Sequence, residues 1–469
     1  MEQSEPRPAG ETGSIEWLLA RVNYERTTGV PYSDRQLKLD RMLQLITLLG
    51  HPDRAAPIIH VAGTKGKGST SAMIAAVLTA AGYRTGVYSS PHLSQIEERF
   101  SIDGLPIATA ELAERLDRIR PFVDEVDRRA TPTGEPALTF FDIATAVALL
   151  YFAEQACQAV VLEVGLGGRL DSTNVCLPDV CVITSISYDH TKQLGNSLAS
   201  IAREKAGIIK PGVPVISGVE SAEAREVIVE VARQHGCRLM ELGHDFHMTY
   251  HASGEEGALQ PRIDYHTAEG QQLQQVALRM LGHHQGINAA IALATLEELE
   301  RQGWNLSEQA RRQGLARVCL PGRLELLPGS PKVILDTAHN EASAQALATA
   351  LDDYFPRPRT LVVACSKDKD VVAIARQLVG SFDRIIATRY LENPRAMDEC
   401  QLADIFRELT VTTPTGAGPI IESYENPRQA FAAALRETSP SGLICVTGSF
   451  FLTAELRPLV VGPPSIASR

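Results

Sequence analysis

Hydrophobic and polar residues alternate along the chain in blocks that predict parallel strands joined by helices. An apolar run over 57–62 leads into a glycine-rich segment and then into a helical pattern with apolar residues on one face. Further apolar runs of strand length occur at 85–89, 159–164 and 180–186. Because helical patterns lie between most of these runs, we predict a parallel sheet with helices on both faces.

The same alternation returns in the last third of the chain, after a break at Cys319-Leu320-Pro321-Gly322 that indicates a linker. Strand-like runs occur there at 332–336, 360–365, 384–388, 420–422 and 443–447. We therefore predict two domains. The first spans 1–320 and includes a small β excursion near 241–277, and the second is a smaller Rossmann-like α/β domain over 321–469.

Residues outside these strands divide into helices and a polar N-terminal segment. Residues 1–13 are polar and contain proline and glycine, so we expect a loose tail. Apolar residues at helical spacing predict two helices between residues 15 and 49, the second over 37–49, and further helices near 109–129, 139–154 and 282–299.

The glycine-rich segment after the first strand has the composition of a phosphate-binding loop. Gly63, Gly66 and Gly68 stand within six residues, and such a turn lets backbone N–H groups point toward one anion at a helix N-terminus. Lys67 would reach the β- and γ-phosphates, and the hydroxyl of Ser69 or Thr70 would contact Mg²⁺. Since Gly68 separates Lys67 from Ser69, the loop is a variant of the usual phosphate-loop pattern. It indicates a P-loop-type parallel-sheet ATPase domain.

Charged residues follow several of the predicted strands, where open α/β sheets bind their ligands. Glu163 ends an apolar run, and a buried carboxylate there indicates either a buried salt bridge or the positioning of a metal or water. His190 could equally be a structural histidine or a ligand. In the second domain Asp336 and His339 follow a strand. Two such crevices facing each other would enclose ATP and a second substrate.

Composition is that of a soluble globular protein. Of 469 residues, 44% are hydrophobic and 22% are charged, and the formal net charge of -11 argues against a nucleic-acid-binding surface. The eight cysteines lack metal-binding spacing and are typical of reduced thiols in a cytoplasmic protein. Since no apolar run approaches the ~18 residues of a spanning helix, we expect no membrane segment.

Several motifs taken together resemble one family, the folylpolyglutamate synthase and dihydrofolate synthase group of the Mur ligases. The resemblance extends over about residues 32–457. It is carried by the segments 63–70, 89–93, 98–100, 162–174, 189–190, 204–210, 321–323, 336–340 and 367–370.

This resemblance implies an ATP-dependent ligation of L-glutamate to a folate or to dihydropteroate. ATP would phosphorylate the acceptor carboxylate, and the glutamate amine would attack the acyl phosphate. The implied catalytic residues are Lys67, Glu163, His190, Lys205 and His339. The implied nucleotide-binding residues are Gly63, Thr64, Gly66, Lys67, Gly68, Ser69, Thr70, Asn288, Arg323 and Asp336.

The resemblance also implies metal and acceptor sites. Ser69, Glu163 and His190 would bind Mg²⁺. Lys205, which the bare sequence shows only as a helix-end lysine, would be carbamylated and serve a second Mg²⁺. The implied acceptor-binding residues are Ser90, Pro91, His92, Phe140, Phe141 and Asp142.

The chain departs from the family pattern at a few positions. Lys65 stands where asparagine is usual, Thr337 and Glu341 replace glycine and proline, and Asp142 replaces glutamate. These differences concern substrate preference.

Two other functions are compatible with a phosphate-binding loop, and they differ from folate ligation in what the protein binds besides the nucleotide. A Mur-type ligase that adds an amino acid to a peptidoglycan precursor would share the fold and the chemistry, but its loop usually has lysine directly before serine or threonine. A P-loop switch or motor would bind nucleotide without a second crevice. We expect a monomer that binds only small molecules.

Overall fold

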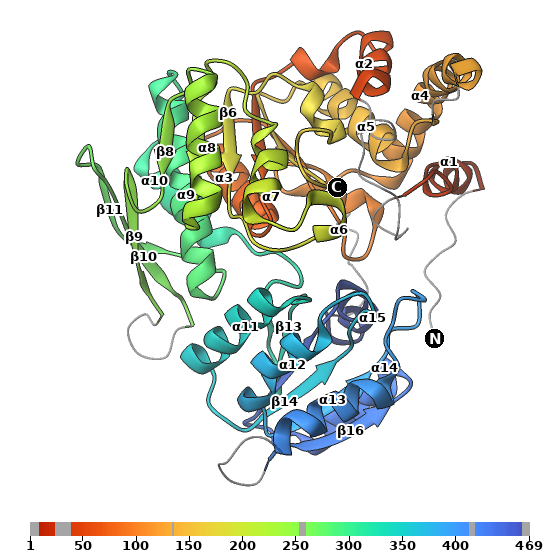
Figure 1. Ribbon diagram of the computed structural model, residues 1–469, viewed down its shortest axis with the longest axis vertical. Coiled ribbons are helices and arrows are strands. Elements are labelled where there is room, and N and C mark those ends of the chain that lie inside the picture. Colours follow the sequence, from red (N-terminus) through yellow and green to blue (C-terminus); the bar gives the residue numbers. More distant parts are fainter. Residues whose placement is uncertain (1–8, 24–38, 134–135, 253–258, 412–417, 462–469) are drawn as a thin grey trace. The chain divides into compact units, whose positions relative to one another are not determined.

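Figure 1 shows the computed structural model, which describes residues 9–23, 39–133, 136–252, 259–411 and 418–461. The chain divides into two compact units. The first comprises 1–249, 264–276 and 287–318, and the second comprises 250–263, 277–286 and 319–469. Each contains a mainly parallel sheet with helices, which confirms the predicted α/β class.

The first unit is built on an eight-stranded sheet in the order β4-β3-β2-β5-β1-β6-β7-β8. Its strands are β1 (Ile58–Ala62), β2 (Thr85–Tyr88), β3 (Phe100–Ile102), β4 (Leu105–Pro106), β5 (Ala159–Glu163), β6 (Val180–Ile183), β7 (Val215–Ser217) and β8 (Leu239–Glu241). The strands from β2 to β8 in this order are parallel, and β3 and β4 extend one edge antiparallel. In the centre Glu163 pairs in register with Val61, so its carboxylate stands where the glycine loop begins.

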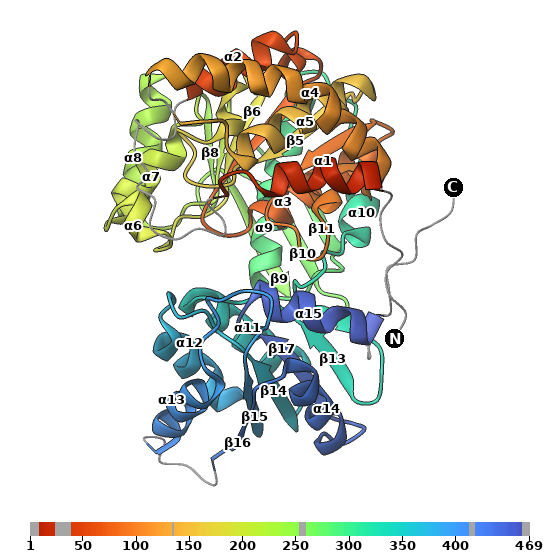
Figure 2. The ribbon, with the colours of Figure 1, turned by 90° about the vertical axis from the view of Figure 1, so that its right-hand side faces the viewer.

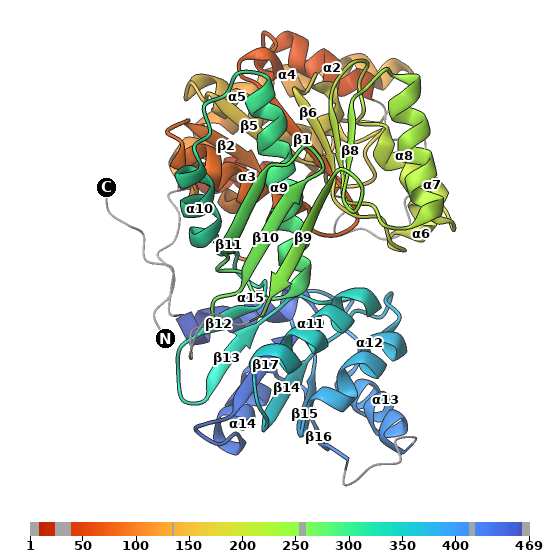
Figure 3. The same cartoon turned by 90° about the vertical axis from the view of Figure 1, so that its left-hand side faces the viewer.

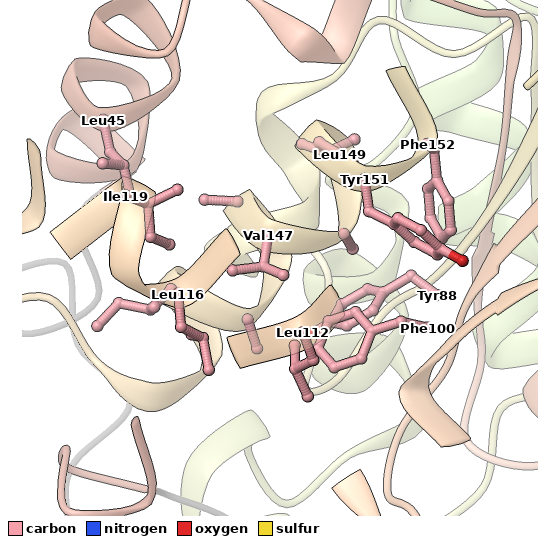
Figure 4. Packing of buried hydrophobic residues seen from close by; sticks show 14 of the residues in the cluster. Leu45, Tyr88, Phe100, Leu112, Leu116, Ile119, Val147, Leu149, Tyr151 and Phe152 are labelled. Carbon is pink, nitrogen blue, oxygen red and sulfur yellow. The ribbon is translucent and has the colours of Figure 1, made fainter. Parts of the chain in front are cut away.

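Helices cover this sheet, and several of them form a hydrophobic core together with its strands. They are α1 (Ala9–Leu19), α2 (Leu39–Leu48), α3 (Lys67–Ala80), α4 (Thr109–Ala130), α5 (Phe140–Glu154), α6 (Thr191–Leu194), α7 (Leu198–Ala206), α8 (Ala222–Gln234), α9 (His283–Arg301) and α10 (Glu308–Arg317). Figure 2 shows α1 beside α4, and Figure 4 shows Leu45 of α2 and Ile119 of α4 in the core that also holds Val147 of α5. The apolar faces of these helices are therefore buried against one another and against the sheet.

A separate three-stranded sheet lies where the small β excursion is expected. Its order is β11-β10-β9, visible in Figure 3. The strands are β9 (Phe246–His251), β10 (Arg262–Thr267) and β11 (Gln272–Ala277).

The second unit has a six-stranded sheet in the order β12-β13-β17-β14-β15-β16, with β12 antiparallel. Its strands are β12 (Glu325–Leu327), β13 (Lys332–Leu335), β14 (Arg359–Val363), β15 (Arg384–Thr388), β16 (Ile420–Tyr424) and β17 (Leu443–Thr447). Its helices are α11 (Glu341–Tyr354), α12 (Val371–Leu378), α13 (Glu399–Val411), α14 (Pro427–Glu437) and α15 (Phe450–Val461). Along β13, Ile334 belongs to one core while Val333 and Leu335 belong to the other, so both faces of the sheet are covered.

Three features differ from the sequence-based expectation. The expected tail over 1–13 is wrong from Ala9 onward, because α1 begins there and buries Ile15 and Leu18 in the core. Residues 1–8 lie outside the described residues. The antiparallel pair β3 and β4, and helix α8, were not anticipated.

Among the described residues, the structure has no helix that combines the length and the apolar character needed to cross a bilayer.

Candidate active site

The glycine loop between β1 and α3 is shaped by close contacts that leave no room for side chains. A Cβ atom at Gly63 would lie 1.9 Å from Thr184 Oγ1, and one at Gly66 would lie 2.3 Å from Asn288 Oδ1. Gly66 also has a φ of +83° at the N-cap of α3, a conformation that glycine adopts without strain. The predicted nucleotide residue Asn288 therefore touches the loop from α9.

Hydrogen bonds to the segment after β6 hold this loop in place. The N–H of Thr64 donates to Ser185 O at 2.7 Å, and the N–H of Lys65 donates to Ser185 Oγ at 3.1 Å. Thr184 Oγ1 donates to Lys65 O at 2.6 Å. Because the first N–H groups of α3 have no preceding helical carbonyl, the loop presents preorganised donors to an anion.

Two lysines converge on this loop. Lys67 Nζ donates to Gly63 O at 3.1 Å, and Lys205 Nζ donates to the same oxygen at 2.8 Å. Lys205 is buried on α7, and this burial, together with the charge of Lys67, lowers the pKa of Lys205 to about 7. A fraction of Lys205 is therefore a neutral amine near neutral pH.

Glu163 stands beside the first turn of α3, with the loop that carries Ser90 on its other side. Its Oε2 lies 3.5 Å from the position that a Cβ atom at Gly68 would take, and it accepts the N–H of Ser90 at 3.3 Å. Further along that loop, His92 Nδ1 accepts from Arg99 Nε at 2.8 Å, while Pro91 is exposed. The structure thus brings Ser90, Glu163 and the phosphate loop together.

The predicted metal ligands fit Mg²⁺ to different degrees. Ser69 is buried in the first turn of α3 and directly follows Gly68, the residue that lies beside the Glu163 carboxylate. A hydroxyl and one carboxylate would occupy two coordination positions of Mg²⁺, which usually fills the others with phosphate oxygens and water. The Thr70 hydroxyl is buried with no hydrogen-bond partner in the part of the chain that the structure describes. His190 occupies the N-cap position of α6. Its ring is half-exposed, and its Nε2 lies 3.9 Å from Asp189 Oδ1. In the described ranges no three His, Cys, Asp or Glu side chains form a metal-binding group by themselves.

The residues predicted for the acceptor also perform structural roles at the N-terminus of α5. Phe140 is fully buried, with the Arg99 guanidinium 5.1 Å above its ring. Phe141 packs on Tyr88, and a Cβ atom at Gly165 would lie 2.5 Å from its ring. Asp142 accepts the N–H and the hydroxyl of Thr139 and the Ser172 hydroxyl. Of the three predicted residues at the start of α5, Phe140 is buried, whereas Phe141 and Asp142 are partly exposed.

In the second unit the predicted residues gather at the ends of β13 and β17. Asp336 accepts the N–H groups of Leu324 at 3.0 Å and Ala338 at 2.7 Å, and burial raises the pKa of Asp336. The Arg323 guanidinium lies 4.8 Å from the Phe450 ring centroid and donates to Thr337 Oγ1.

His339 completes this group through a second contact with Phe450. Its Nδ1 lies 2.8 Å from Thr337 O, so Nδ1 donates to that carbonyl, and its ring centroid lies 6.0 Å from that of Phe450. Phe450 therefore contacts both Arg323 and His339. Phe450 was not predicted from the sequence, although it stands three residues after the buried run 443–447, at a strand end like the one that Asp336 occupies.

The comparisons with known proteins cover nearly the whole chain. The family described as Mur ligase middle domain matches residues 61–296, and the family described as Mur ligase, glutamate ligase domain matches residues 322–450. The dihydrofolate synthase/folylpolyglutamate synthase of Bacillus subtilis (strain 168) is 35% identical over 425 residues, which are 89% of this chain and 94% of that protein.

Solved structures agree with these matches. The folylpolyglutamate synthase of Mycobacterium tuberculosis complexed with ADP is 32% identical, with a TM-score of 0.84 over 97% of this chain and 99% of that chain. FolC of Escherichia coli in complex with DHPP and ADP is 31% identical, with a TM-score of 0.78 over 97% and 99% of the two chains. The chain therefore belongs to the folylpolyglutamate synthase and dihydrofolate synthase family of ATP-dependent Mur ligases.

Proposed function

We propose that this protein ligates L-glutamate to a folate, to dihydropteroate, or to both, through an acyl phosphate. The observation that carries this proposal is the convergence of Lys67, Lys205 and Glu163 on the glycine loop, in a chain whose relatives bear the names of these two activities. The same names favour a folate acceptor over a peptidoglycan precursor.

ATP would bind with its phosphates at the N-terminus of α3. The backbone N–H groups of the loop would hold the phosphate oxygens, and Lys67 would move from Gly63 O to the terminal phosphates. Asn288, which touches Gly66, would contact the nucleotide from α9. Support comes from the two solved relatives complexed with ADP.

Ser69, Glu163 and His190 would hold Mg²⁺, which when bound neutralises charge on the phosphates. Lys205 would contribute to a second Mg²⁺ position after carbamylation. In that step the neutral amine forms an N–C bond to CO₂ and loses one proton, which leaves a carbamate anion. Burial of Lys205 favours the neutral amine that this reaction requires.

The proposed reaction consists of two successive displacements, in which ADP is the first leaving group and phosphate is the second. A carboxylate oxygen of the acceptor attacks the γ-phosphorus and ADP leaves. The L-glutamate amine then attacks the acyl carbon and phosphate leaves. A carboxylate is otherwise a poor electrophile at neutral pH, so the first step makes the second possible.

Each unit would supply one part of this reaction. We propose that Ser90, Pro91 and His92, with Phe141 and Asp142, contact the acceptor in the first unit, and that Phe140 supports them from the core. Arg323, Asp336 and His339 of the second unit would contact the nucleotide and the γ-phosphate. The division of the chain into domains 1–320 and 321–469 remains part of this proposal.

We also propose that the protein acts as a cytoplasmic monomer. All eight cysteines are free thiols and five of them are buried, as expected in a reducing compartment. Light scattering of the purified protein would measure its mass directly.

The test measures ADP release and product mass with ATP, Mg²⁺ and each acceptor. The acceptors are dihydropteroate, tetrahydrofolate and a nucleotide-linked peptidoglycan precursor, each with and without L-glutamate. We expect ADP release that depends on glutamate and a product one glutamyl group heavier than a pteridine acceptor. ADP release without glutamate dependence, or a product only from the peptidoglycan precursor, would refute the proposal.

A further inference from the structure

The loop that follows Glu163 is closed on itself by one buried carboxylate. Asp171 Oδ2 accepts the N–H groups of Gly165 at 3.0 Å and Leu166 at 2.9 Å, and Asp171 Oδ1 accepts the N–H of Thr173 at 3.0 Å. Asp171 therefore joins the start of this loop to its end. Burial raises the pKa of Asp171 to about 6, so the group is still a carboxylate at pH 7.5.

A fourth hydrogen bond to Asp171 comes from the Thr173 hydroxyl, and it determines which atoms donate in the hydrogen bonds that continue from Thr173 to His60 and Cys176. Thr173 Oγ1 donates its only hydrogen to Asp171 Oδ1 at 2.5 Å. His60 Nε2 lies 2.8 Å from the same Thr173 oxygen, so that nitrogen must be the donor. His60 Nδ1 then carries the lone pair and faces Cys176 Sγ at 3.7 Å.

Burial removes the alternatives to this arrangement. Asp171, Thr173, His60 and Cys176 are all buried. Desolvation and the charge of Lys210 lower the pKa of His60 to about 3, so its ring is neutral and carries a single N–H. The neutral ring and the ionised Asp171 leave one consistent placement of the hydrogens.

The closed loop is attached to the end of α7, where Lys205 lies. The N–H of Arg169 donates to Glu204 O at 2.7 Å, and a Cβ atom at Gly168 would lie 2.8 Å from Glu204 O and 3.0 Å from Lys205 O. Asn174 Nδ2 donates to Arg169 O at 2.9 Å and to Gly207 O at 3.0 Å. A change in the shape of this loop would therefore move the backbone of Lys205.

We propose that His60 and Thr173 are positioning residues, which orient Asp171 so that the 165–170 loop holds Glu163 and Lys205 against the phosphate loop. His60 does this as its Nε2–H tautomer, from the strand that leads into Gly63. The inference rests on the proposed function, because Glu163 and Lys205 are the groups whose placement it explains.

Paired variants separate hydrogen bonding from packing. Thr173→Val keeps the shape but removes the hydroxyl, and His60→Leu removes the ring donor. We expect kcat to fall about tenfold or more in both, with KM for ATP nearly unchanged. Thr173→Ser and His60→Gln, which retain a donor at the required place, should keep most of the activity. Wild-type kcat in Thr173→Val would overturn the proposal.

A matched control tests whether any buried threonine hydroxyl would have this effect. Thr438 Oγ1 donates to Thr360 Oγ1 at 2.7 Å in the second unit, and both residues are buried. Thr438→Val should retain wild-type kcat. An equal loss in this variant would show a general effect of stability and would contradict the assignment.

The tautomer can be measured in the intact wild-type protein, even if a variant does not fold. Nitrogen-15 NMR of the histidine rings, with His60 assigned by comparison with His60→Gln, should show an Nε2–H ring that does not titrate between pH 5 and 9. An Nδ1–H or titrating ring would overturn the proposal. If instead the wild type shows no glutamate-dependent ADP release, the proposed function fails while this measurement still reports on the hydrogen-bond chain.

Discussion

Glu297 is a buried carboxyl group that joins α9 to the three-stranded sheet. Its Oε2 accepts the Tyr265 hydroxyl at 3.1 Å. Burial raises the pKa of Glu297 to about 7, against an ordinary value of 4.5. Between these two values the folded protein binds more protons than the unfolded chain, so this group makes the free energy of unfolding decrease as pH rises.

Glu297→Gln should remove that pH dependence. The amide oxygen can still accept from Tyr265, but no charge is buried. We expect the variant to be more stable than the wild type at pH 8 and nearly equal to it at pH 4.5, measured by urea unfolding. Equal stabilities at pH 8 would show that Glu297 is not buried as a charge.

Single residues also show what the sequence could predict of the site. Gly63, Gly66, Lys67 and Glu163 were identified because a glycine loop and a strand-end carboxylate are local signals, and the structure places them together. His60 and Thr173 were missed as a pair because they are 113 residues apart and meet only across the fold. Phe450 was missed because an aromatic residue on a helix is usually read as core.

Helices α3 and α10 pack so closely that there is no room for a side chain at Gly314, where they cross. A Cβ atom at Gly314 of α10 would lie 2.6 Å from Val77 Cα of α3, a backbone contact that side-chain movement cannot relieve. Because α3 begins at the phosphate loop, this crossing supports the site from the far end of the helix.

Gly314→Ala should therefore destabilise the first unit by about 1–3 kcal/mol. Gly13, in α1, is the matched control, because a Cβ atom added there would have no other atom within 4 Å. Gly13→Ala should instead raise stability by about 0.5–1 kcal/mol through helix propensity. Thermal unfolding of both variants checks the pair, and a neutral Gly314→Ala would contradict the crossing.

The turn from β17 into α15 places Phe450 against the Arg323 guanidinium, and this contact can be tested by substitution. Phe450→Leu should raise KM for ATP about two- to fivefold, since Arg323 loses a cation–π contact of roughly 0.5–1 kcal/mol. Phe450→Tyr should keep the contact and the affinity. Phe451, which packs on Tyr390 at 5.1 Å instead, provides Phe451→Leu as the control with unchanged KM.

The elements that the sequence did not predict, or predicted only in part, share one physical cause. Helix α1 was predicted only from Ile15 onward, because the residues before it lack apolar periodicity, and the helix is held by Ile15 and Leu18 in a core formed with distant helices. Strands β3 and β4 are three and two residues long and pair only with each other and β2. Such segments depend on tertiary contacts more than on their own periodicity, whereas the long apolar runs of β1, β5 and β17 were predicted closely.

For the whole molecule, the two α/β units follow from the repeated alternation of strands and helices. The order of strands within each sheet was not predictable, because periodicity does not say which strands are neighbours. Each unit has its own hydrophobic cores, so each can respond to a ligand as a cooperative body.

Mg²⁺ and ADP at 100 times their dissociation constant should stabilise the folded chain by about 2.7 kcal/mol. Thermal unfolding with and without ligand measures this shift. Lys67→Ala should unfold at the wild-type temperature without ligand and should lose most of the shift. A full shift in Lys67→Ala would remove that lysine from the nucleotide site.

The carbonyl of Gly63 has a consequence for selectivity, because it accepts a hydrogen bond from each of the two lysines. An entering anion must draw Lys67 away from that oxygen, at a cost of about 0.5–1.5 kcal/mol for the bond it breaks. A single phosphate ion gains fewer contacts in return for this cost than a triphosphate, which spans both the loop and the ammonium. The loop is therefore expected to bind inorganic phosphate, the product that must leave before another cycle begins, more weakly than ATP.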